Sequence, residues 1–301
     1  MSGSPVLRLF RTLVVLGRVS NLATVWSNCL AGWWLSSGVR AKALAEIPSL
    51  VDLGRLPLLL LGASCLYVGG MFLNDAFDAE FDREFRPQRP IASGAVSQRA
   101  VWRWSFAWLG IGALLLILLG RTTGILALGL VVLIVLYDAF HKKITFAPTL
   151  MGLCRLLLYL IAASTGASGI NGTAIWCGLA LALYVTGLSF LARKEATTSA
   201  PDYWPCALLA APILLAFVLN GPGYREAAFL LSLILALWIL RSLRAAFWST
   251  ERQTGQVVSL LLAGIVFVDW LAVADAPKQA GFVFVPLFLL ALVLQRFVPA
   301  S

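Results

Sequence analysis

Long apolar runs separated by short polar breaks dominate this sequence. Most runs approach the 20 residues that an apolar helix needs to cross the hydrocarbon core of a bilayer. Open strands cannot satisfy their backbone hydrogen bonds in lipid, so the runs are expected to be helices. They lie near residues 12–36, 56–74, 101–120, 122–138, 149–167, 173–192, 204–220, 226–245, 256–273 and 281–297. The sequence therefore predicts an all-α, polytopic transmembrane helical bundle with nine to ten spans.

The composition agrees with burial in a membrane. Of the 301 residues, 60% are hydrophobic and only 12% are charged, whereas soluble domains carry about 25% charged residues. We therefore expect one transmembrane domain over residues 1–301 and no soluble domain. The first apolar run is too long for the core of a signal peptide and has no small-residue cleavage site, so it is interpreted as the first span.

The distribution of Lys and Arg predicts the orientation of the chain. If the N-terminus is cytoplasmic and the spans alternate, most of the 23 Lys and Arg residues fall on the cytoplasmic side, as the positive-inside rule requires. The same asymmetry explains the net charge of +9. Nucleic-acid binding is excluded, because little soluble surface is left to form a basic face. We expect an integral membrane protein of a bacterial inner membrane, surrounded by membrane lipids.

Polar chemistry is concentrated where the second apolar run ends, in residues 70–97. Asn74, Asp78 and Asp82 follow one another at intervals of four residues, which places them in one stripe along a helix. Oxygen ligands at a membrane surface suit Mg²⁺, which takes one or two carboxylates together with water and phosphate oxygens. The alternative is that these acids only pair with the arginines of residues 83–89. Spacing alone does not decide between the two interpretations.

The pattern Asn-Asp-x-x-Asp-x-x-x-Asp over residues 74–82, followed by Arg-Pro-Ile-x-Ser-Gly over residues 89–94, resembles the first signature of the UbiA-type intramembrane prenyltransferases. The resemblance implies a UbiA-like fold and transfer of a prenyl group from a prenyl diphosphate to a small-molecule or lipid acceptor, with Mg²⁺ as the cofactor. Residues 137–143 and 151–155 are also similar to the UbiA-like proteins encoded in bacterial ebo-type clusters.

The resemblance also implies roles for individual residues. The expected metal ligands are Asn74, Asp78 and Asp82. The expected catalytic residues are Asp78, Asp82, Lys142 and Glu195. The expected substrate-binding residues are Asn21, Arg18, Arg89, Arg155, Arg193 and Lys194. Each role has an alternative that stays open. In these alternatives Arg89 only stabilises its own loop, Lys142 only extends to lipid phosphate, and Asn21 only forms an interhelical hydrogen bond.

One part of the family pattern is degenerate. A second acidic motif is expected near the end of the sixth run, but residues 189–202 offer only Glu195 in a suitable place. Three explanations follow. In the first, the chain is a single-Mg²⁺ enzyme in which Arg193 and Lys194 supply positive charge. In the second, the acceptor or donor of the enzyme lacks the usual head group. In the third, the chain is a non-catalytic relative that binds a prenyl lipid or assists export. The intact first motif favours the enzyme.

Two other classes of membrane protein fit less well. A transporter usually carries its polar site near the bilayer midplane, whereas this acidic stripe lies at the end of a run. A phospholipid-type phosphotransferase would need an Asp-Gly-x-x-Ala-Arg segment, which is absent. Asp269 lies inside the ninth run, and an acid at such a position is expected to be functional. The sequence leaves open whether Asp269 lines the pocket, lies on a proton path or lies near the outer mouth.

Overall fold

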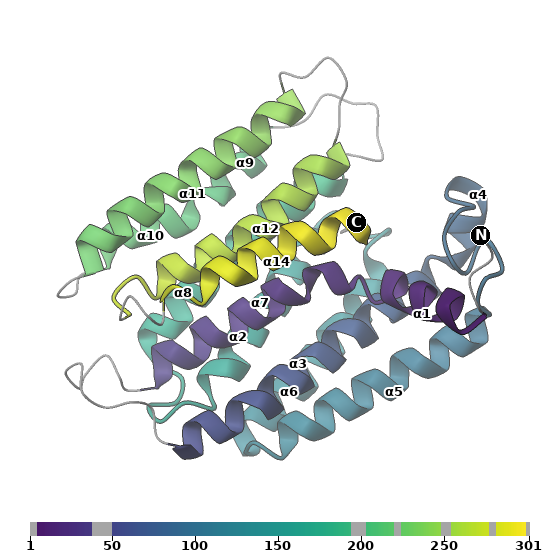
Figure 1. Ribbon diagram of the computed structural model, residues 1–301, viewed down its shortest axis with the longest axis horizontal. Coiled ribbons are helices and arrows are strands. Elements are labelled where there is room, and N and C mark those ends of the chain that lie inside the picture. The colour runs from purple at the N-terminus through teal and green to yellow at the C-terminus, as the bar shows by residue number, and fades with distance from the viewer. Residues whose placement is uncertain are drawn as a thin grey trace.

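The computed structural model describes residues 5–37, 50–193, 203–219, 224–247, 254–276 and 281–298, and within these ranges the chain contains helices and no strands. The helices run along one another in a bundle (Figure 1). Their bounds are α1 Pro5–Leu16, η1 Val19–Asn21, α2 Leu22–Ser36, α3 Leu50–Phe77, α4 Ala79–Phe85, α5 Gln98–Ile117, α6 Arg121–Phe140, α7 Ala147–Ala163, α8 Gly172–Arg193, α9 Trp204–Leu209, α10 Ala211–Val218, α11 Tyr224–Phe247, α12 Thr254–Ala272 and α14 Phe284–Phe297.

Each of the ten predicted apolar runs contains a helix, and the all-α bundle is confirmed. Six helices in the described ranges are long and apolar enough to cross a membrane. Residues 147–163, 204–218 and 284–297 form shorter apolar helices. Nine to ten spans are therefore compatible with the structure, provided that the shorter helices also cross.

The first apolar run differs from the single span that was predicted. The chain leaves α1 after Leu16 and passes through the short 3-10 turn η1 before α2 begins at Leu22. The break is centred on Arg18, whose φ of 41° is incompatible with a right-handed helix. Residues 6–11 are exposed and residues 12–15 are half-buried, whereas α2 is mostly buried. Only the second part of the run is therefore a core helix.

The seventh run is also divided, into α9 and α10, at Ala210. Pro205 and Pro212 each lie in the first turn of one of these helices. Proline is tolerated there because its missing N–H would have no partner in the first turn. Pro212 cannot donate a hydrogen bond to the preceding turn, which explains why the run divides at Ala210.

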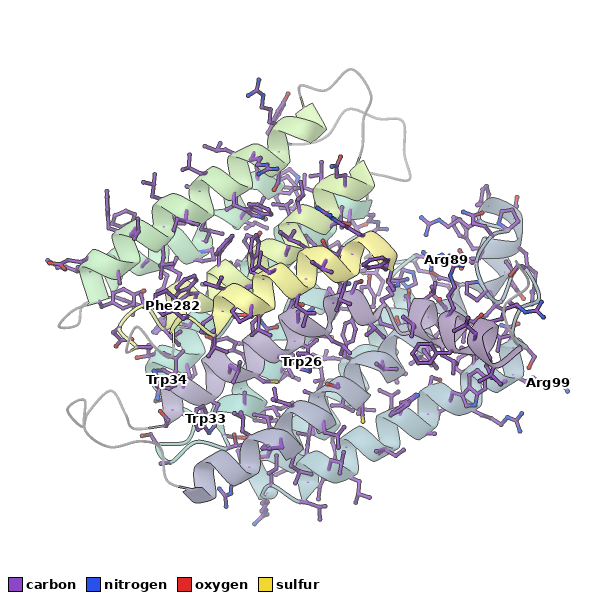
Figure 2. All side chains as sticks on the ribbon, viewed as in Figure 1. Trp26, Trp33, Trp34, Arg89, Arg99 and Phe282 are labelled. Carbon is purple, nitrogen blue, oxygen red and sulfur yellow. The ribbon has the colours of Figure 1, made fainter. Side chains whose placement is uncertain are left out.

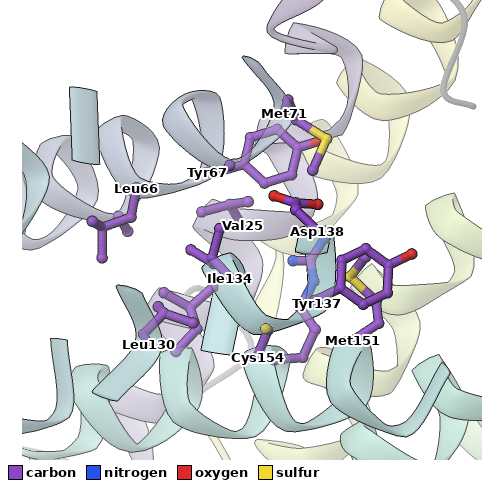
Figure 3. A pocket seen from close by; sticks show the side chains of 14 residues that line it. Val25, Leu66, Tyr67, Met71, Leu130, Ile134, Tyr137, Asp138, Met151 and Cys154 are labelled. Carbon is purple, nitrogen blue, oxygen red and sulfur yellow. The ribbon is translucent and has the colours of Figure 1, made fainter. Parts of the chain in front are cut away.

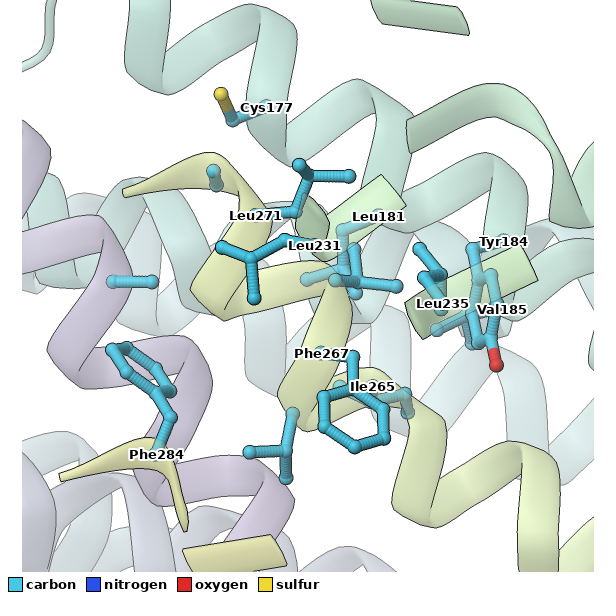
Figure 4. Close-up of a cluster of buried hydrophobic side chains, with 14 of the residues drawn as sticks. Cys177, Leu181, Tyr184, Val185, Leu231, Leu235, Ile265, Phe267, Leu271 and Phe284 are labelled. Atoms are coloured by element: carbon cyan, nitrogen blue, oxygen red, sulfur yellow. The ribbon is translucent and has the colours of Figure 1, made fainter. Parts of the chain in front are cut away.

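Helices α2 and α7 lie at the centre of the bundle and contribute to both large apolar clusters. The first cluster joins α2 and α7 to α8, α10, α11, α12 and α14, and Figure 4 shows part of it, including Tyr184, Leu235 and Phe267. The second joins α2 and α7 to α3, α5 and α6. Apolar surface is not driven together in lipid as it is in water, so close packing must hold these helices.

Two glycines allow that close packing around α7. A Cβ on Gly32 of α2 would lie 2.5 Å from the carbonyl oxygen of Tyr159 in α7. A Cβ on Gly152 of α7 would lie 2.5 Å from the carbonyl oxygen of Ala182 in α8. Both distances are shorter than any real contact, so only glycine lets these backbones approach as they do.

The two ends of the bundle differ in chemistry. Figure 2 shows Trp33, Trp34 and Phe282 near one end and Arg89 and Arg99 near the other. Aromatic side chains favour the interface between lipid and water, and basic side chains favour the cytoplasmic face. The helix α4, which continues the acidic stripe, lies at the basic end (Figure 1).

A third, smaller apolar cluster anchors the basic end. Leu16 of α1 and Phe72 of α3 pack with Ile91 and Val96 of the loop that follows α4. Gln98, the first residue of α5, donates from Nε2 to the carbonyl oxygen of Ala76 at 3.0 Å. These contacts hold the loop over the end of α3 and so position Arg89.

Candidate active site

The predicted acidic stripe is present at the end of α3. The backbone N–H of Asp78 donates to Asn74 O at 2.9 Å, and that of Asp82 donates to Asp78 O at 2.8 Å. Helical hydrogen bonding therefore continues across the boundary between α3 and α4, which keeps the three side chains one turn apart. Asn74, Asp78 and Asp82 are each no more than 8% exposed. Buried carboxylates of this kind require partners.

Asp75 is a counter-ion for two arginines. Its Oδ1 atom accepts from Arg89 Nη1 at 2.8 Å and from Arg18 Nη2 at 3.3 Å. Arg18 also donates to Asn74 Oδ1 at 3.2 Å. The buried carboxylate of Asp75 thus fixes two guanidinium groups beside the stripe. There the two groups face any anion that approaches the stripe.

Arg18 reaches the stripe because of the break between α1 and α2. Among the described non-glycine residues it alone has a positive φ. The left-handed conformation costs about 1–2 kcal/mol for a residue with a Cβ. Strain of this kind persists where surrounding contacts demand it, and here those contacts are with Asn74 and Asp75. The break that shortens the first core helix therefore serves the site.

Asp78 is paired with two residues that follow α6. Lys142 Nζ lies 2.6 Å from Asp78 Oδ1, and His141 Nε2 lies 3.4 Å from the same atom. Burial alone would raise the pKa of Asp78, but the hydrogen bonds and charges of His141 and Lys142 lower it below its ordinary value. Asp78 is therefore an anion at neutral pH, able to bind a cation. Lys142 also lies over the Phe81 ring, 4.1 Å from its centroid.

Asp82 is the least engaged member of the stripe. Its Oδ2 atom lies 3.9 Å from Arg89 Nε, and its buried Oδ1 atom has no hydrogen-bond partner among the described residues. Burial raises the pKa of this carboxyl group, although the charge of Arg89 opposes the shift. An orphaned buried carboxylate oxygen is a natural place for a metal ion.

The donor set fits Mg²⁺ held partly by its substrate. In the described part of the chain, no three His, Cys, Asp or Glu side chains converge closely enough to bind a metal by themselves. Mg²⁺ does not need such a cage, because it keeps several waters and shares phosphate oxygens with one or two carboxylates. Asn74 and the carboxylates of Asp78 and Asp82 offer those oxygens.

A mostly apolar pocket adjoins the stripe on the bundle side. It has a volume of about 80 Å³ and lies between α2, α3, α6 and α7. Asp138 connects the two regions, since its Oδ1 accepts from Asn74 Nδ2 at 3.0 Å while its side chain lines the pocket. Figure 3 shows Tyr67 and Asp138 pointing toward one another across this space. A charged head group can thus lie at the stripe while apolar groups enter the bundle.

The remaining predicted residues are placed in different surroundings. Asn21 is buried in the turn before α2, next to the break at Arg18. Arg155 lines the pocket deeper in the bundle. Arg193 Nη1 donates to the carbonyl oxygens of Ile144 and Thr145 at 2.8 and 3.1 Å, so it fastens the loop after Lys142. Lys194 and Glu195 lie outside the described residues.

Three residues of the site were missed by sequence reasoning. Asp75 lies outside the four-residue spacing of the stripe, yet it orients both arginines. His141 is the single histidine of the sequence and belongs to no motif, and its contact with Asp78 crosses between helices. Asp138 could have been identified from the sequence, since an acid at the end of an apolar run is a candidate functional residue.

The fold and the site together define an integral membrane helical bundle with an acidic and basic site at the mouth of an apolar pocket. Residues 33–292 match the UbiA prenyltransferase family. The chain belongs to this family.

Individual relatives agree with that assignment. The chain is 35% identical over 178 residues to the digeranylgeranylglyceryl phosphate synthase of Ignicoccus hospitalis, covering 59% of this chain and 52% of that one. It is 37% identical over 140 residues to the enzyme of the same name from Metallosphaera sedula, covering 46% and 43%. The matched regions thus span about half the length of these curated relatives.

The fold is similar to that of a solved UbiA homolog from Aeropyrum pernix K1 in its apo form. The TM-score is 0.62 at 18% sequence identity, and the superposition covers 84% of this chain and 97% of the homolog. The predicted UbiA-like fold is therefore confirmed. The finer similarity to the ebo-type subfamily stays a prediction.

Proposed function

We propose that this protein transfers a prenyl group from an isoprenoid diphosphate to an acceptor inside the membrane, with Mg²⁺ as cofactor. The observation that carries the proposal is the buried stripe of Asn74, Asp78 and Asp82, held between Arg18, Arg89 and Lys142. Family membership and the two relatives named digeranylgeranylglyceryl phosphate synthase support the same activity.

Asn74, Asp78 and Asp82 would hold the metal ion. When bound, Mg²⁺ neutralises negative charge that develops on the departing diphosphate. Arg18 and Arg89 add fixed positive charge beside it, and Asp75 keeps their guanidinium groups in place. Such preorganised charge stabilises a transition state without reorganisation during the reaction.

The reaction needs little else from the protein. The allylic C–O bond breaks and diphosphate leaves with the electron pair. The nucleophilic atom of the acceptor bonds to the resulting carbocation and gives up its proton to the released diphosphate. The pocket beneath the stripe would limit the access of water, since its walls are mostly apolar. Limited access of water protects the cation from hydrolysis.

The positive charge around the site supports a reaction with one metal ion. Lys142 pairs with Asp78 and lies at the same mouth, and Arg193 holds the loop that carries it. Lys194 and Glu195, which follow Arg193 in the sequence, keep their proposed roles as a substrate-binding residue and a catalytic residue. We also propose that the site faces the cytoplasm of a bacterial cell, because Lys and Arg are in excess at this end of the helical bundle.

Diphosphate release tests the proposal directly. The protein in lipid nanodiscs is given geranyl, farnesyl or geranylgeranyl diphosphate with a panel of acceptors, with and without Mg²⁺. We expect Mg²⁺-dependent release with at least one donor, reduced about 10²-fold or more in Asp78→Ala and Asp82→Ala.

Glu80→Gln is the matched control, because Glu80 is an exposed acid of α4 beside the stripe. Its activity should equal that of the wild type. Tight binding of a prenyl lipid with no diphosphate release from any donor, unaffected by either aspartate substitution, would instead establish a non-catalytic binding protein.

A further inference from the structure

Arg155 is a charged residue deep in the bundle. It lies on α7, eight residues beyond the start of that helix, or about 12 Å along its axis. It is only 8% exposed, yet it lines the pocket beneath the acidic stripe. A cation at such a depth is costly, and such residues usually face a cavity where they serve a substrate or an ion.

The protein partners of Arg155 are neutral. Its Nη1 donates to Asn28 Oδ1 at 2.7 Å, and its Nη2 donates to Thr24 Oγ1 at 3.2 Å, both on α2. No carboxylate pairs directly with this guanidinium among the described residues. A guanidinium has five N–H donors, so these two bonds leave capacity for another oxygen ligand.

Asp269 supports the arrangement through the same residue of α2, Asn28. Asp269 is fully buried on α12 and accepts from Ser27 Oγ at 2.5 Å and from Asn28 Nδ2 at 2.7 Å. The amide of Asn28 therefore bridges the carboxylate and the guanidinium. This bridge fixes the Asn28 oxygen toward Arg155, while the two charges remain separated by one side chain.

The pocket wall around Arg155 offers few other polar groups. Val25, Leu130 and Leu158 are apolar, and polar atoms come mainly from Tyr67, Tyr137 and Asp138. Asp138 lies at the end toward the stripe, because it accepts from Asn74. The diphosphate has its own cations at the mouth, namely Arg18, Arg89 and Lys142, so Arg155 is available to a second ligand.

We infer that Arg155 binds an oxyanion, a carboxylate or a phosphate, carried by the acceptor, and that Asn28 and Asp269 are positioning residues for it. The inference rests on the proposed prenyl transfer for its biological meaning, but it predicts binding that is independent of catalysis. The acceptor would enter the pocket with its acidic group toward Arg155 and its nucleophilic group toward the stripe.

Direct binding is measured first, without donor or Mg²⁺, by calorimetry on the protein in nanodiscs. The probes are matched pairs: hydroxybenzoate against hydroxybenzamide for the carboxylate, and a prenylated glycerol phosphate against the corresponding alcohol for the phosphate. We expect one anionic probe to bind at least 10-fold more tightly than its neutral partner. Equal binding within both pairs would overturn the inference.

Variants then assign the preference to Arg155. Arg155→Met should abolish the 10-fold preference, and Arg155→Lys should retain part of it. Arg121→Met, which removes an exposed arginine from the first turn of α6, is the control. Asn28→Leu removes the amide that orients the guanidinium and should weaken binding of the anionic probe but not of the neutral one. If Arg155→Met does not fold, Arg155→Lys and Asn28→Leu decide the question, and an unchanged preference in both contradicts the inference.

Turnover distinguishes the inference from the proposed function. In an active protein, Arg155→Met should raise KM for the anionic acceptor about 10-fold or more and leave KM for the prenyl diphosphate unchanged. A raised donor KM with an unchanged acceptor KM would assign Arg155 to the donor and overturn the inference. If the wild type shows no transfer while the anionic probe still binds through Arg155, the proposed function fails and the oxyanion site stands.

Discussion

At the scale of single residues, the site is a set of acids and bases that pair across helices. Asp75 joins Arg18 from the break before α2 to Arg89 from the loop after α4. Asp78 joins the end of α3 to Lys142 after α6. Each acid thus orders basic groups from distant parts of the sequence, and the same basic groups are suited to bind diphosphate.

Lys142 should contribute to turnover through its charge. Lys142→Met is expected to lower kcat about 10- to 10²-fold, because it removes a cation beside Asp78 at the site of the leaving group. Lys142→Arg should retain more activity than Lys142→Met. Steady-state diphosphate release gives the comparison.

The neighbouring Lys143 supplies the control for this prediction. It is exposed, so Lys143→Met should leave kcat near the wild-type value. Equal losses in Lys142→Met and Lys143→Met would indicate that only the general basicity of the loop matters.

The contact between His141 and Asp78 should make stability depend on pH. Burial tends to lower the pKa of His141, but the hydrogen bond and negative charge of Asp78 raise it above its ordinary value. A raised pKa in the folded state means that the stabilisation is fully present below the unfolded pKa of about 6.5. It is lost as the pH rises through the folded value.

Thermal unfolding in detergent at a series of pH values checks this. His141→Gln should be less stable than the wild type by on the order of 1 kcal/mol below pH ~6, and the difference should shrink toward pH ~9. A difference that grows with pH would contradict the assigned pair.

At the scale of helices, small residues set the distances on which the pocket depends. Helix α7 packs against both α2 and α8 at Gly32 and Gly152. It also carries Arg155, so its placement decides where that side chain meets the pocket. The geometry of the site is therefore coupled to backbone contacts well below the stripe.

Gly32→Ala should destabilise the bundle. The added Cβ would lie 2.5 Å from a backbone oxygen, which cannot move aside as a flexible side chain could. Overpacking of this kind costs about 1–3 kcal/mol. Gly110→Ala in α5 is the control, since a Cβ there meets nothing within 4 Å.

The control should be neutral or slightly more stable, because alanine favours helices over glycine by up to about 1 kcal/mol. Unfolding temperatures of the two variants in detergent give the measurement. A Gly32→Ala protein as stable as Gly110→Ala would mean that α2 and α7 do not approach as closely as the structure has it.

At the scale of the whole molecule, the bundle separates a charged mouth from an apolar interior. The mouth is assembled from α3, α4, the loop before α5 and the end of α6, while α2 and α7 form the pocket wall behind it. Ligands that engage the mouth should therefore tie several helices together and stabilise the entire fold.

Mg²⁺ and a diphosphate should stabilise the protein only in combination. A non-hydrolysable farnesyl thiodiphosphate at about 100 times its Kd should add about 2.7 kcal/mol, seen as a raised Tm when Mg²⁺ is present. EDTA should remove most of this gain, and Asp82→Ala should lack it. A gain that survives EDTA in full would exclude a metal-linked site.

Local sequence patterns predict the class of fold and the centre of the chemistry. Apolar runs of near-membrane length leave the backbone no alternative to helix, and spacing of four residues puts Asn74, Asp78 and Asp82 on one helix face in any helical context. Both features are local, so they can be predicted without tertiary information.

Which residues face one another depends on the packing of the helices. The break at Arg18, the pairing of Asp75 with two arginines, the contact of His141 with Asp78 and the bridge from Asp269 to Arg155 all join segments far apart in the chain. Their geometry depends on how closely α2, α3, α6 and α7 pack. That closeness comes from small residues and shape, which hydrophobic periodicity does not encode.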